Sequence, residues 1–428
     1  MFRLKNVEIN GFWGQYSIET DFNNEVNIFI GRNGTGKTTF INLLQAVISV
    51  DLELLFRLQF DSIVLNLNEG SKNRKIEVKK IAHDLQYKEL HYQVGTKKYK
   101  LPIIPDSELR YLSKRNGRIH PKFFIEIQEI KSIIGKLINV SYLSVNRDNI
   151  LKDDTRDTRR EEIYNAIDIR LEELIGQLTT YQFLLESELS KLSKKFQEDV
   201  LRSMLYNEDF DNVDISEIVK PDLRRINIGL KQAYRGLGIL DDETEKTIEK
   251  HVSAIEKAAN SINNYIEDRT KPVYPNDVTP LTLLRRTKKI NDLSSELEGR
   301  KKKIFERLDD YIKLLNEFHE TKDFVLQDSK IGGLAIIKDK KEILLSQLSS
   351  GEKQLIILLT EALLQKGKQT LFIADEPELS LHIEWQRKVI SSIKKLNPNS
   401  QIIVATHSPE IVGKFQDSTI NMEKIING

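Results

Sequence analysis

The sequence predicts an α/β head built from both ends of the chain, with an antiparallel β-lobe and an inserted helical or coiled-coil domain. Short apolar runs of strand length occur within residues 1–150 and again within 323–428. Between them, residues 151–322 carry apolar side chains at steps of three and four, the spacing of a long helix or coiled coil. A chain of 428 residues is also too long for one ordinary core. We therefore expect a head that is divided in the sequence around a helical insertion.

The N-terminal half of this head contains Gly31–Thr38, whose glycines, lysine and threonine have the spacing G-x-x-x-x-G-K-T. A buried-strand pattern, Val26–Ile30, precedes it, and a helical pattern, Thr39–Ala46, follows. Glycines allow backbone N–H groups to point at phosphate oxygens, and a helix N-terminus adds partial positive charge. Because strand, loop and helix agree, we favour a phosphate loop over a glycine turn that merely precedes a helix.

A phosphate loop with this spacing predicts ATP and Mg²⁺ as cofactors. Lys37 is expected to reach the β- and γ-phosphates, and the Thr38 hydroxyl to ligate Mg²⁺. The predicted nucleotide-binding residues are Asn33, Gly34, Thr35, Gly36, Lys37, Thr38 and Thr39. The loop by itself indicates only a nucleotide, so the kind of enzyme has to be inferred from the rest of the chain.

Four further stretches lie in the C-terminal half of the head. They are Leu348–Gln354, Leu371–Glu376, Leu379–His382 and Ile402–His407. Together with the phosphate loop they resemble, in order, the motifs of ATP-binding-cassette (ABC) ATPases. Within these the chain looks like the soluble RecF/SMC/OLD-type group, which includes AAA ATP-binding proteins of antiphage defence systems such as Septu PtuA and PARIS AriA. The resemblance covers the two ends of the chain and leaves the helical insertion unmatched.

This resemblance implies roles for the residues at two strand ends. Asp375 is expected to hold Mg²⁺ together with Thr38, and Glu376 to act as the base that activates the attacking water. His407 would hold the γ-phosphate or that water. The predicted catalytic residues are therefore Glu376, His407 and Lys37.

The resemblance also implies that each site is composite, formed by the heads of a homodimer or higher homo-oligomer. The signature residues expected to contact ATP in another subunit are Ser349, Ser350, Gly351 and Glu352. They open a helix, whose free N–H groups suit a γ-phosphate. Taken alone, this string predicts only a helix cap, and Ser350 replaces the glycine of the commonest signature. Ser380 and His382 belong to a D-loop-like stretch and are predicted near the seam between subunits.

Two positions keep open alternatives. The family has a glutamine near Asn146 that senses Mg²⁺, and Asn146 either substitutes for it or is an ordinary loop residue. Trp13 either approaches the adenine, as an aromatic residue near this place does in the family, or packs in the core.

The β-lobe is predicted from three short strand patterns within residues 60–105, separated by polar turns. Its lysines fit a solvated sheet face better than a DNA track, so DNA binding is not signalled by the sequence. In the insertion, two long helices are expected to run antiparallel. Thr279 is predicted to cap the returning helix, with Pro280 at its first position.

Composition excludes several classes of protein. The 65 basic residues almost balance the 64 acidic ones, so no global nucleic-acid signal exists. Cysteine is absent, which excludes disulfides, zinc–thiolate sites and thiol catalysis. No apolar run is long enough to span a membrane, and the N-terminus lacks the apolar core of a signal peptide. We expect a soluble, cytoplasmic protein, which excludes a one-chain transporter, and nothing in the sequence points to a membrane partner.

Three functions fit the motifs. The first is a defence ATPase that holds or releases a separate effector, a nuclease or toxin, according to its ATP state. The second is a RecF- or SMC-like DNA repair or recombination ATPase. The third, an ATPase with its own nuclease as in OLD proteins, is disfavoured because only a short segment follows His407. The compact, proline-interrupted insertion favours the first function over the second.

Overall fold

The computed structural model describes residues 1–82, 88–102, 121–144, 166–205, 221–327 and 332–427. The chain forms two compact units. The head unit comprises Met1–Leu178, Asp310–Leu326 and Gly333–Gly428, and the helical unit comprises Thr179–Asp309 and Gln327–Gly332. Two of the boundaries between the units fall inside long helices. The sequence analysis places the insertion at residues 151–322, and that assignment of domains stays a prediction.

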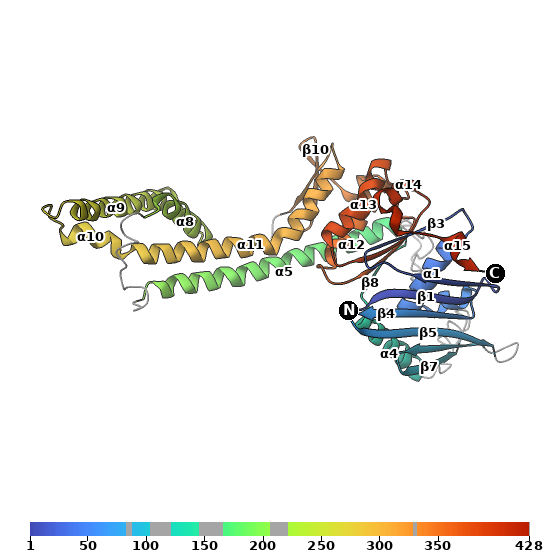
Figure 1. Ribbon diagram of the computed structural model, residues 1–428. Coiled ribbons are helices and arrows are strands. Elements are labelled where there is room, and N and C mark those ends of the chain that lie inside the picture. The colour runs from blue at the N-terminus through green and yellow to red at the C-terminus, as the bar shows by residue number, and fades with distance from the viewer. Residues whose placement is uncertain (83–87, 103–120, 145–165, 206–220, 328–331, 428) are drawn as a thin grey trace. The chain divides into compact units, whose positions relative to one another are not determined.

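The central layer of the head unit is a five-stranded sheet in the order β14-β3-β13-β12-β8, with all strands parallel (Figure 1). Its strands are β3 (Val26–Ile30), β8 (Val140–Ser144), β12 (Leu371–Asp375), β13 (Gln401–Ala405) and β14 (Thr419–Asn421). The helices α1 (Lys37–Ser49), α12 (Ser350–Leu364) and α13 (Ile383–Leu396) connect to it. Parallel strands need both faces covered, which explains their continuous apolar runs. Because the strands are parallel, their carboxyl ends meet at one edge.

The second layer is a seven-stranded antiparallel sheet in the order β15-β2-β1-β4-β5-β6-β7. Its strands are β1 (Arg3–Phe12), β2 (Tyr16–Asp21), β4 (Ser62–Glu69), β5 (Lys72–Ala82), β6 (Lys88–Val94), β7 (Lys97–Pro102) and β15 (Ile426–Asn427). Its inward side chains share one hydrophobic core with α1, α2 (Leu52–Arg57) and α4 (Pro121–Leu137). The predicted α/β head with an antiparallel β-lobe is confirmed.

A small sheet precedes the signature helix. Its strands β9 (Asp323–Leu326), β10 (Leu334–Lys338) and β11 (Lys341–Ile343) are antiparallel, and the short helix η1 (Leu345–Gln347) leads from β11 to α12. The chain ends with α14 (Pro409–Val412), η2 (Gly413–Ser418), β14, α15 (Met422–Ile425) and β15.

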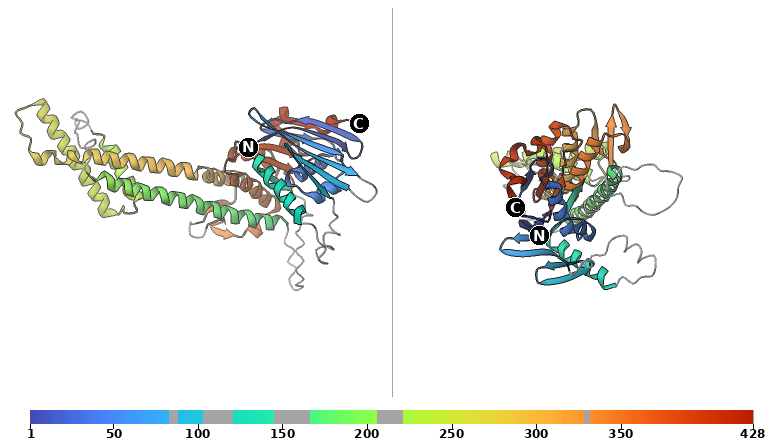
Figure 2. Two further views of the ribbon diagram at one scale, coloured as in Figure 1. Left: turned by 90° about the horizontal axis from the view of Figure 1, so that it is seen from below. Right: turned by 90° about the vertical axis from the view of Figure 1, so that its right-hand side faces the viewer.

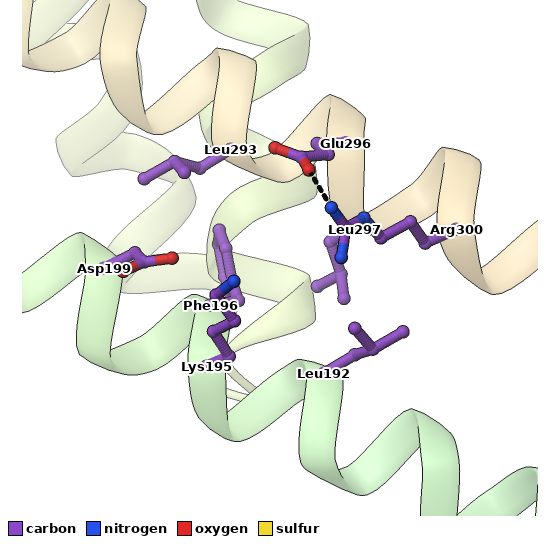
Figure 3. A pocket seen from close by; sticks show the side chains of 8 residues that line it. All are labelled: Leu192, Lys195, Phe196, Asp199, Leu293, Glu296, Leu297 and Arg300. Carbon is purple, nitrogen blue, oxygen red and sulfur yellow. Dashed lines mark hydrogen bonds and ion pairs between the residues drawn. The ribbon is translucent and has the colours of Figure 1, made fainter.

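The helical unit contains most of α5 (Ala166–Ser203) and α11 (Leu284–Phe318), together with α8 (Leu223–Gly236), α9 (Asp242–Glu267) and α10 (Pro275–Thr282). Figures 1 and 2 show α5 and α11 side by side. Figure 3 shows Phe196 of α5 and Leu297 of α11 in the apolar contact between these two helices. Along α11, Glu296 forms an ion pair with Arg300. The residue that follows the end of α5 lies beside the start of α11, because the Arg286 guanidinium donates to the Met204 carbonyl at 3.0 Å. The two helices are therefore antiparallel, as predicted.

The predicted start of the returning helix is wrong. Pro280 lies inside the short helix α10, and the long helix begins afterwards, at Leu284. The Thr279 hydroxyl donates to the Pro275 carbonyl four residues earlier, which is a bond within a helix, not a cap. Within the parts of the chain that are described, no helix is long and apolar enough to cross a bilayer.

Candidate active site

The phosphate loop connects the end of β3 with the start of α1. Gly34 and Gly36 have positive φ angles of 81° and 90°, a region that residues with a Cβ rarely adopt. Gly36 occupies the N-cap of α1 and, as a glycine, gives this helix no side-chain cap. Asn33, Gly34 and Thr38 are exposed at this point. The loop thus presents open N–H donors at a positive helix end, which is the arrangement that binds phosphate.

Lys37 is buried at the first position of α1. Its ammonium donates to the Gly31 carbonyl at 2.9 Å and to the Arg32 carbonyl at 3.3 Å, and lies 2.7 Å from Nε2 of His407. Burial lowers the pKa of Lys37, and the neighbouring Glu376 carboxylate opposes that shift. The ammonium is therefore held at the loop by two carbonyl groups and an imidazole, which a phosphate can replace.

Thr38 and Asp375 form the best place for a metal ion. The Thr38 hydroxyl donates to Oδ1 of Asp375 at 3.3 Å, across the edge where β12 ends. Burial raises the pKa of Asp375, although the bond from Thr38 opposes the shift. Among the described residues, no group of three or more His, Cys, Asp or Glu could hold a metal by itself. One carboxylate and one hydroxyl suit Mg²⁺, which takes its remaining ligands from water and substrate phosphates.

Glu376 follows Asp375 and lies at the same edge. Its φ angle of 50° is unusual for a residue with a side chain, and its N–H donates to the Ala405 carbonyl at 2.8 Å. Its carboxylate lies 3.3 Å from Nε2 of His407. Burial, followed by the nearby carboxylate of Glu378, raises the pKa of Glu376 to about 7. The tertiary structure thus brings Lys37, Thr38, Asp375, Glu376 and His407 together from three separate segments, the start of α1 and the ends of β12 and β13.

Glu378 is a site residue that the sequence analysis misses. It is 8% exposed, and its Oε1 accepts hydrogen bonds from the Thr406 hydroxyl, from His407 N–H at 3.0 Å and from Ser408 N–H at 3.2 Å. The available signal was its position two residues after Glu376. That signal is weak, because the contact depends on β12 lying next to β13.

The signature residues open α12. Ser349 caps this helix in a capping box: the Glu352 N–H donates to the Ser349 hydroxyl at 3.3 Å, and Ser349 N–H donates to the Glu352 carboxylate at 2.8 Å. Gly351 packs against the Ser380 carbonyl, which would lie 2.2 Å from an added Cβ. Ser350 is exposed at the first helical position.

The remaining predicted positions have simpler surroundings. His382 caps α13, where its Nδ1 accepts from Glu384 N–H at 3.4 Å. Trp13 lies beside the phosphate loop, and its ring is close to where a Cβ on Gly36 would be. Asn146 lies outside the described residues.

A model of the AAA ATPase domain family matches residues 2–412. The chain belongs to this family. As a member of the AAA ATPase domain family it is an ATPase, in agreement with the site described above. The predicted relationship to the group that includes RecF, SMC and antiphage ATPases is confirmed by the relatives of this chain.

The chain is 22% identical over 446 residues to the retron Ec83 probable ATPase of Escherichia coli, an alignment that covers 98% of this chain and 71% of that protein. It is 50% identical over 42 residues to Septu protein PtuA of Bacillus thuringiensis, which covers 10% of this chain and 11% of that one. An Smc head domain with an extended coiled coil, derived from Pyrococcus furiosus, aligns with a TM-score of 0.44 and 14% identity over 99% of this chain and 94% of that chain.

Proposed function

We propose that this ATPase hydrolyses Mg²⁺-ATP at composite sites between subunits, and that its ATP state holds or releases a separate effector protein in antiphage defence. The proposal for the chemistry rests on one observation, the convergence of the phosphate loop with Asp375, Glu376 and His407. The proposal for the biology rests on the similarity to proteins named as a retron ATPase and as Septu PtuA.

In the chemical step, Lys37 would leave the Gly31 carbonyl and bind the β- and γ-phosphates. Mg²⁺, held by Thr38 and Asp375, would neutralise phosphate charge when it is bound. Glu376 would orient the water and accept its proton, and His407 would keep the Glu376 carboxylate and the γ-phosphate in line. Positioning and neutralisation of charge are what phosphoryl transfer requires of a protein.

The second part of each site would come from another subunit. One chain carries a single phosphate loop and a single signature segment. The exposed Ser350 and the positive N-terminal end of α12 suit an approaching γ-phosphate, with Ser349, Gly351 and Glu352 shaping that end. Ser380 and His382 would lie near the same seam. This arrangement predicts at least a homodimer.

The ATP state would reach the insertion through α12. On the outgoing side, Asp168 of α5 pairs with Lys353 at 2.6 Å, and Arg170 of α5 pairs with the buried Glu361. Ser141 of β8 donates to the same Glu361 carboxylate at 2.9 Å. Since all of these residues belong to the head unit, α12 is bonded there to the first turns of α5.

On the returning side, Lys322 pairs with Glu352, the residue that completes the cap of α12. The Tyr311 hydroxyl of α11 lies 2.8 Å from the Thr360 hydroxyl of α12, and both residues are buried. A helix that contacts the γ-phosphate of a partner would therefore move the ends of α5 and α11 together. This is a rigid-body route from nucleotide to effector.

The experiment is co-expression of the chain with its genomic neighbours, followed by pull-down and native mass spectrometry. Lys37→Ala should abolish ATP binding, and Glu376→Gln should retain ATP and change the amount of effector that is captured. Coupling is reciprocal, so the effector should change ATP affinity by the same factor. If all variants capture equal amounts with and without ATP, the effector proposal fails while ATP hydrolysis stands.

An SMC-like DNA ATPase is the alternative, favoured by 26% identity over 242 residues to the chromosome partition protein Smc of Methanocaldococcus jannaschii. That alignment covers 53% of this chain and 19% of that protein. Retention of duplex DNA at moderate salt, with affinity that falls steeply as salt rises, would support this function instead.

A further inference from the structure

The loop that carries His407 is held from inside the head by a single carboxylate. Oε1 of Glu378 accepts three hydrogen bonds, from the side chain of Thr406 and from the N–H groups of His407 and Ser408. Two of these donors belong to the backbone on either side of the His407 Cα. Because hydrogen bonds are directional, these bonds fix the position of the His407 main chain. They thereby set the direction in which the imidazole side chain leaves it.

The same loop is also tied to the D-loop-like segment. The Ser408 hydroxyl donates to Oε1 of Gln386 at 2.6 Å, and Nε2 of Gln386 donates to the Leu381 carbonyl at 2.9 Å. The Ser408 hydroxyl accepts in turn from Glu410 N–H at 3.1 Å. Glu378 and Gln386 therefore hold the loop from two sides, and both connect it to the segment after β12.

The surroundings of Glu378 are unfavourable for a carboxylate, which is unexpected if this side chain only stabilises the fold. The side chain is buried, and Oε2 has no hydrogen-bond partner within the described structure. Burial of a carboxylate oxygen without a donor is unfavourable and calls for an explanation. Placement of a catalytic side chain is such an explanation, since His407 lies between Lys37 and Glu376.

We propose that Glu378 is a positioning residue for ATP hydrolysis, whose carboxylate places the His407 imidazole between the Lys37 ammonium and the Glu376 carboxylate. The inference rests on the proposed role of His407 in hydrolysis. Glu378 touches neither nucleotide nor metal in this scheme and acts through the Thr406 hydroxyl and the N–H groups of His407 and Ser408. Its charge also raises the pKa of Glu376, an effect that Glu378→Gln would remove while keeping an acceptor for the loop. Loss of the Glu378 side chain should therefore lower kcat and leave the KM for ATP nearly unchanged.

The first test compares Glu378→Ala, Glu378→Gln and the control Glu410→Gln by steady-state kinetics. Alanine removes the acceptor of all three bonds and should lower kcat by about 10- to 100-fold, with KM within about twofold. Glutamine keeps one acceptor oxygen and should recover most of that loss. Glu410 pairs with Arg387 on the surface nearby, and its substitution should change neither constant. A Glu378→Ala kcat within twofold of wild type would overturn the proposal.

The second test is a double-mutant cycle with His407→Ala. If Glu378 acts through His407, the double variant should be no slower than His407→Ala alone. Fully additive losses would show that Glu378 stabilises the head in another way, and the proposal would be wrong. Thr406→Val serves if Glu378→Ala does not fold. It keeps the carboxylate and removes the hydroxyl that donates to Glu378 and accepts from Ser408 N–H. It should lower kcat alone and lose its effect when combined with His407→Ala. Wild-type kcat in Thr406→Val, or additive losses with His407→Ala, would then overturn the proposal.

The activities of His407→Ala and Glu378→Ala distinguish a failure of this inference from a failure of the proposed role of His407. If His407→Ala hydrolyses ATP as wild type does, the proposed role of His407 fails, and that of Glu378 fails with it. If His407→Ala is impaired and Glu378→Ala is not, only the role of Glu378 is wrong.

Discussion

At the scale of the residue, the site holds its charged groups in contact with one another. His407 Nε2 is the common neighbour, 2.7 Å from the Lys37 ammonium and 3.3 Å from Glu376. The two flanking groups have opposite charges when Glu376 is ionised, so their pKa values are shifted by burial and restored in part by each other. When nucleotide binds, the Lys37 ammonium would exchange the loop carbonyls for phosphate oxygens.

Glu376→Gln is the residue-scale prediction. The amide keeps the size of the side chain but cannot accept the proton of water, so kcat should fall by about 10² to 10⁴. Asp375 and Thr38 remain, so Mg²⁺-ATP should still bind. Rapid-quench kinetics would show uncleaved ATP retained on the protein. The matched control is Glu423→Gln, because that carboxylate accepts from Arg32 N–H at the loop and carries no proposed role in cleavage. Equal turnover in Glu376→Gln and wild type would exclude Glu376 as the base.

At the scale of the element, α12 is both capped and anchored at its first turn. Burial acts to raise the pKa of Glu352, but the bonds from Lys322 and Ser349 outweigh it, so that the pKa is lowered. A carboxyl whose folded-state pKa is depressed stabilises the fold above its ordinary pKa, and the benefit is lost as pH falls through the lowered value.

The element-scale prediction is that Glu352→Gln destabilises the head in a pH-dependent way. The difference in Tm from wild type should be largest near neutral pH and should shrink below about pH 4, where the wild-type carboxyl begins to protonate. Scanning calorimetry across pH measures this difference. Glu306→Gln, at an exposed position of α11, should show no such dependence. A constant difference in Tm from pH 7 downward would mean that the lost interaction is not ionic.

At the scale of the whole molecule, the proposal requires two chains for one site. The structure guides the choice of a signature variant. Gly351 is a poor choice, because any side chain there would collide with the Ser380 carbonyl of its own chain. Ser350 is exposed and follows the cap, so Ser350→Arg adds bulk toward the partner and leaves the cap intact.

The whole-molecule prediction is rescue by mixing. Lys37→Ala and Ser350→Arg should each be inactive, and a mixed oligomer should recover one intact site, from the phosphate loop of one chain and the signature of the other. A mixture equilibrated to a statistical dimer distribution should reach about a quarter of wild-type turnover, since half of its dimers carry one site of two. The control joins both substitutions in one chain and mixes it with Lys37→Ala, a mixture in which every phosphate loop lacks its lysine and no intact site can form. Activity no greater than that control would argue against composite sites.

Much of this protein was determined by local sequence. The phosphate loop was predictable because strand, glycine turn and helix are consecutive, and their conformations depend on neighbouring residues. The antiparallel β-lobe followed from alternation and turns, and the long helices α5 and α11 followed from their apolar spacing. The prediction that Pro280 starts the returning helix was wrong, because Pro280 lies inside the short helix α10 and the long helix α11 begins afterwards.

Only the tertiary structure decided which distant residues act together. Glu378 holds the His407 loop because β12 and β13 are adjacent and parallel, and no local pattern specifies that pairing. The ion pairs of α12 with Asp168 and Arg170 likewise join segments that the helical unit separates in the sequence. Such contacts depend on how the two halves of the head pack, so the sequence determined the parts of the site and the fold determined what connects them.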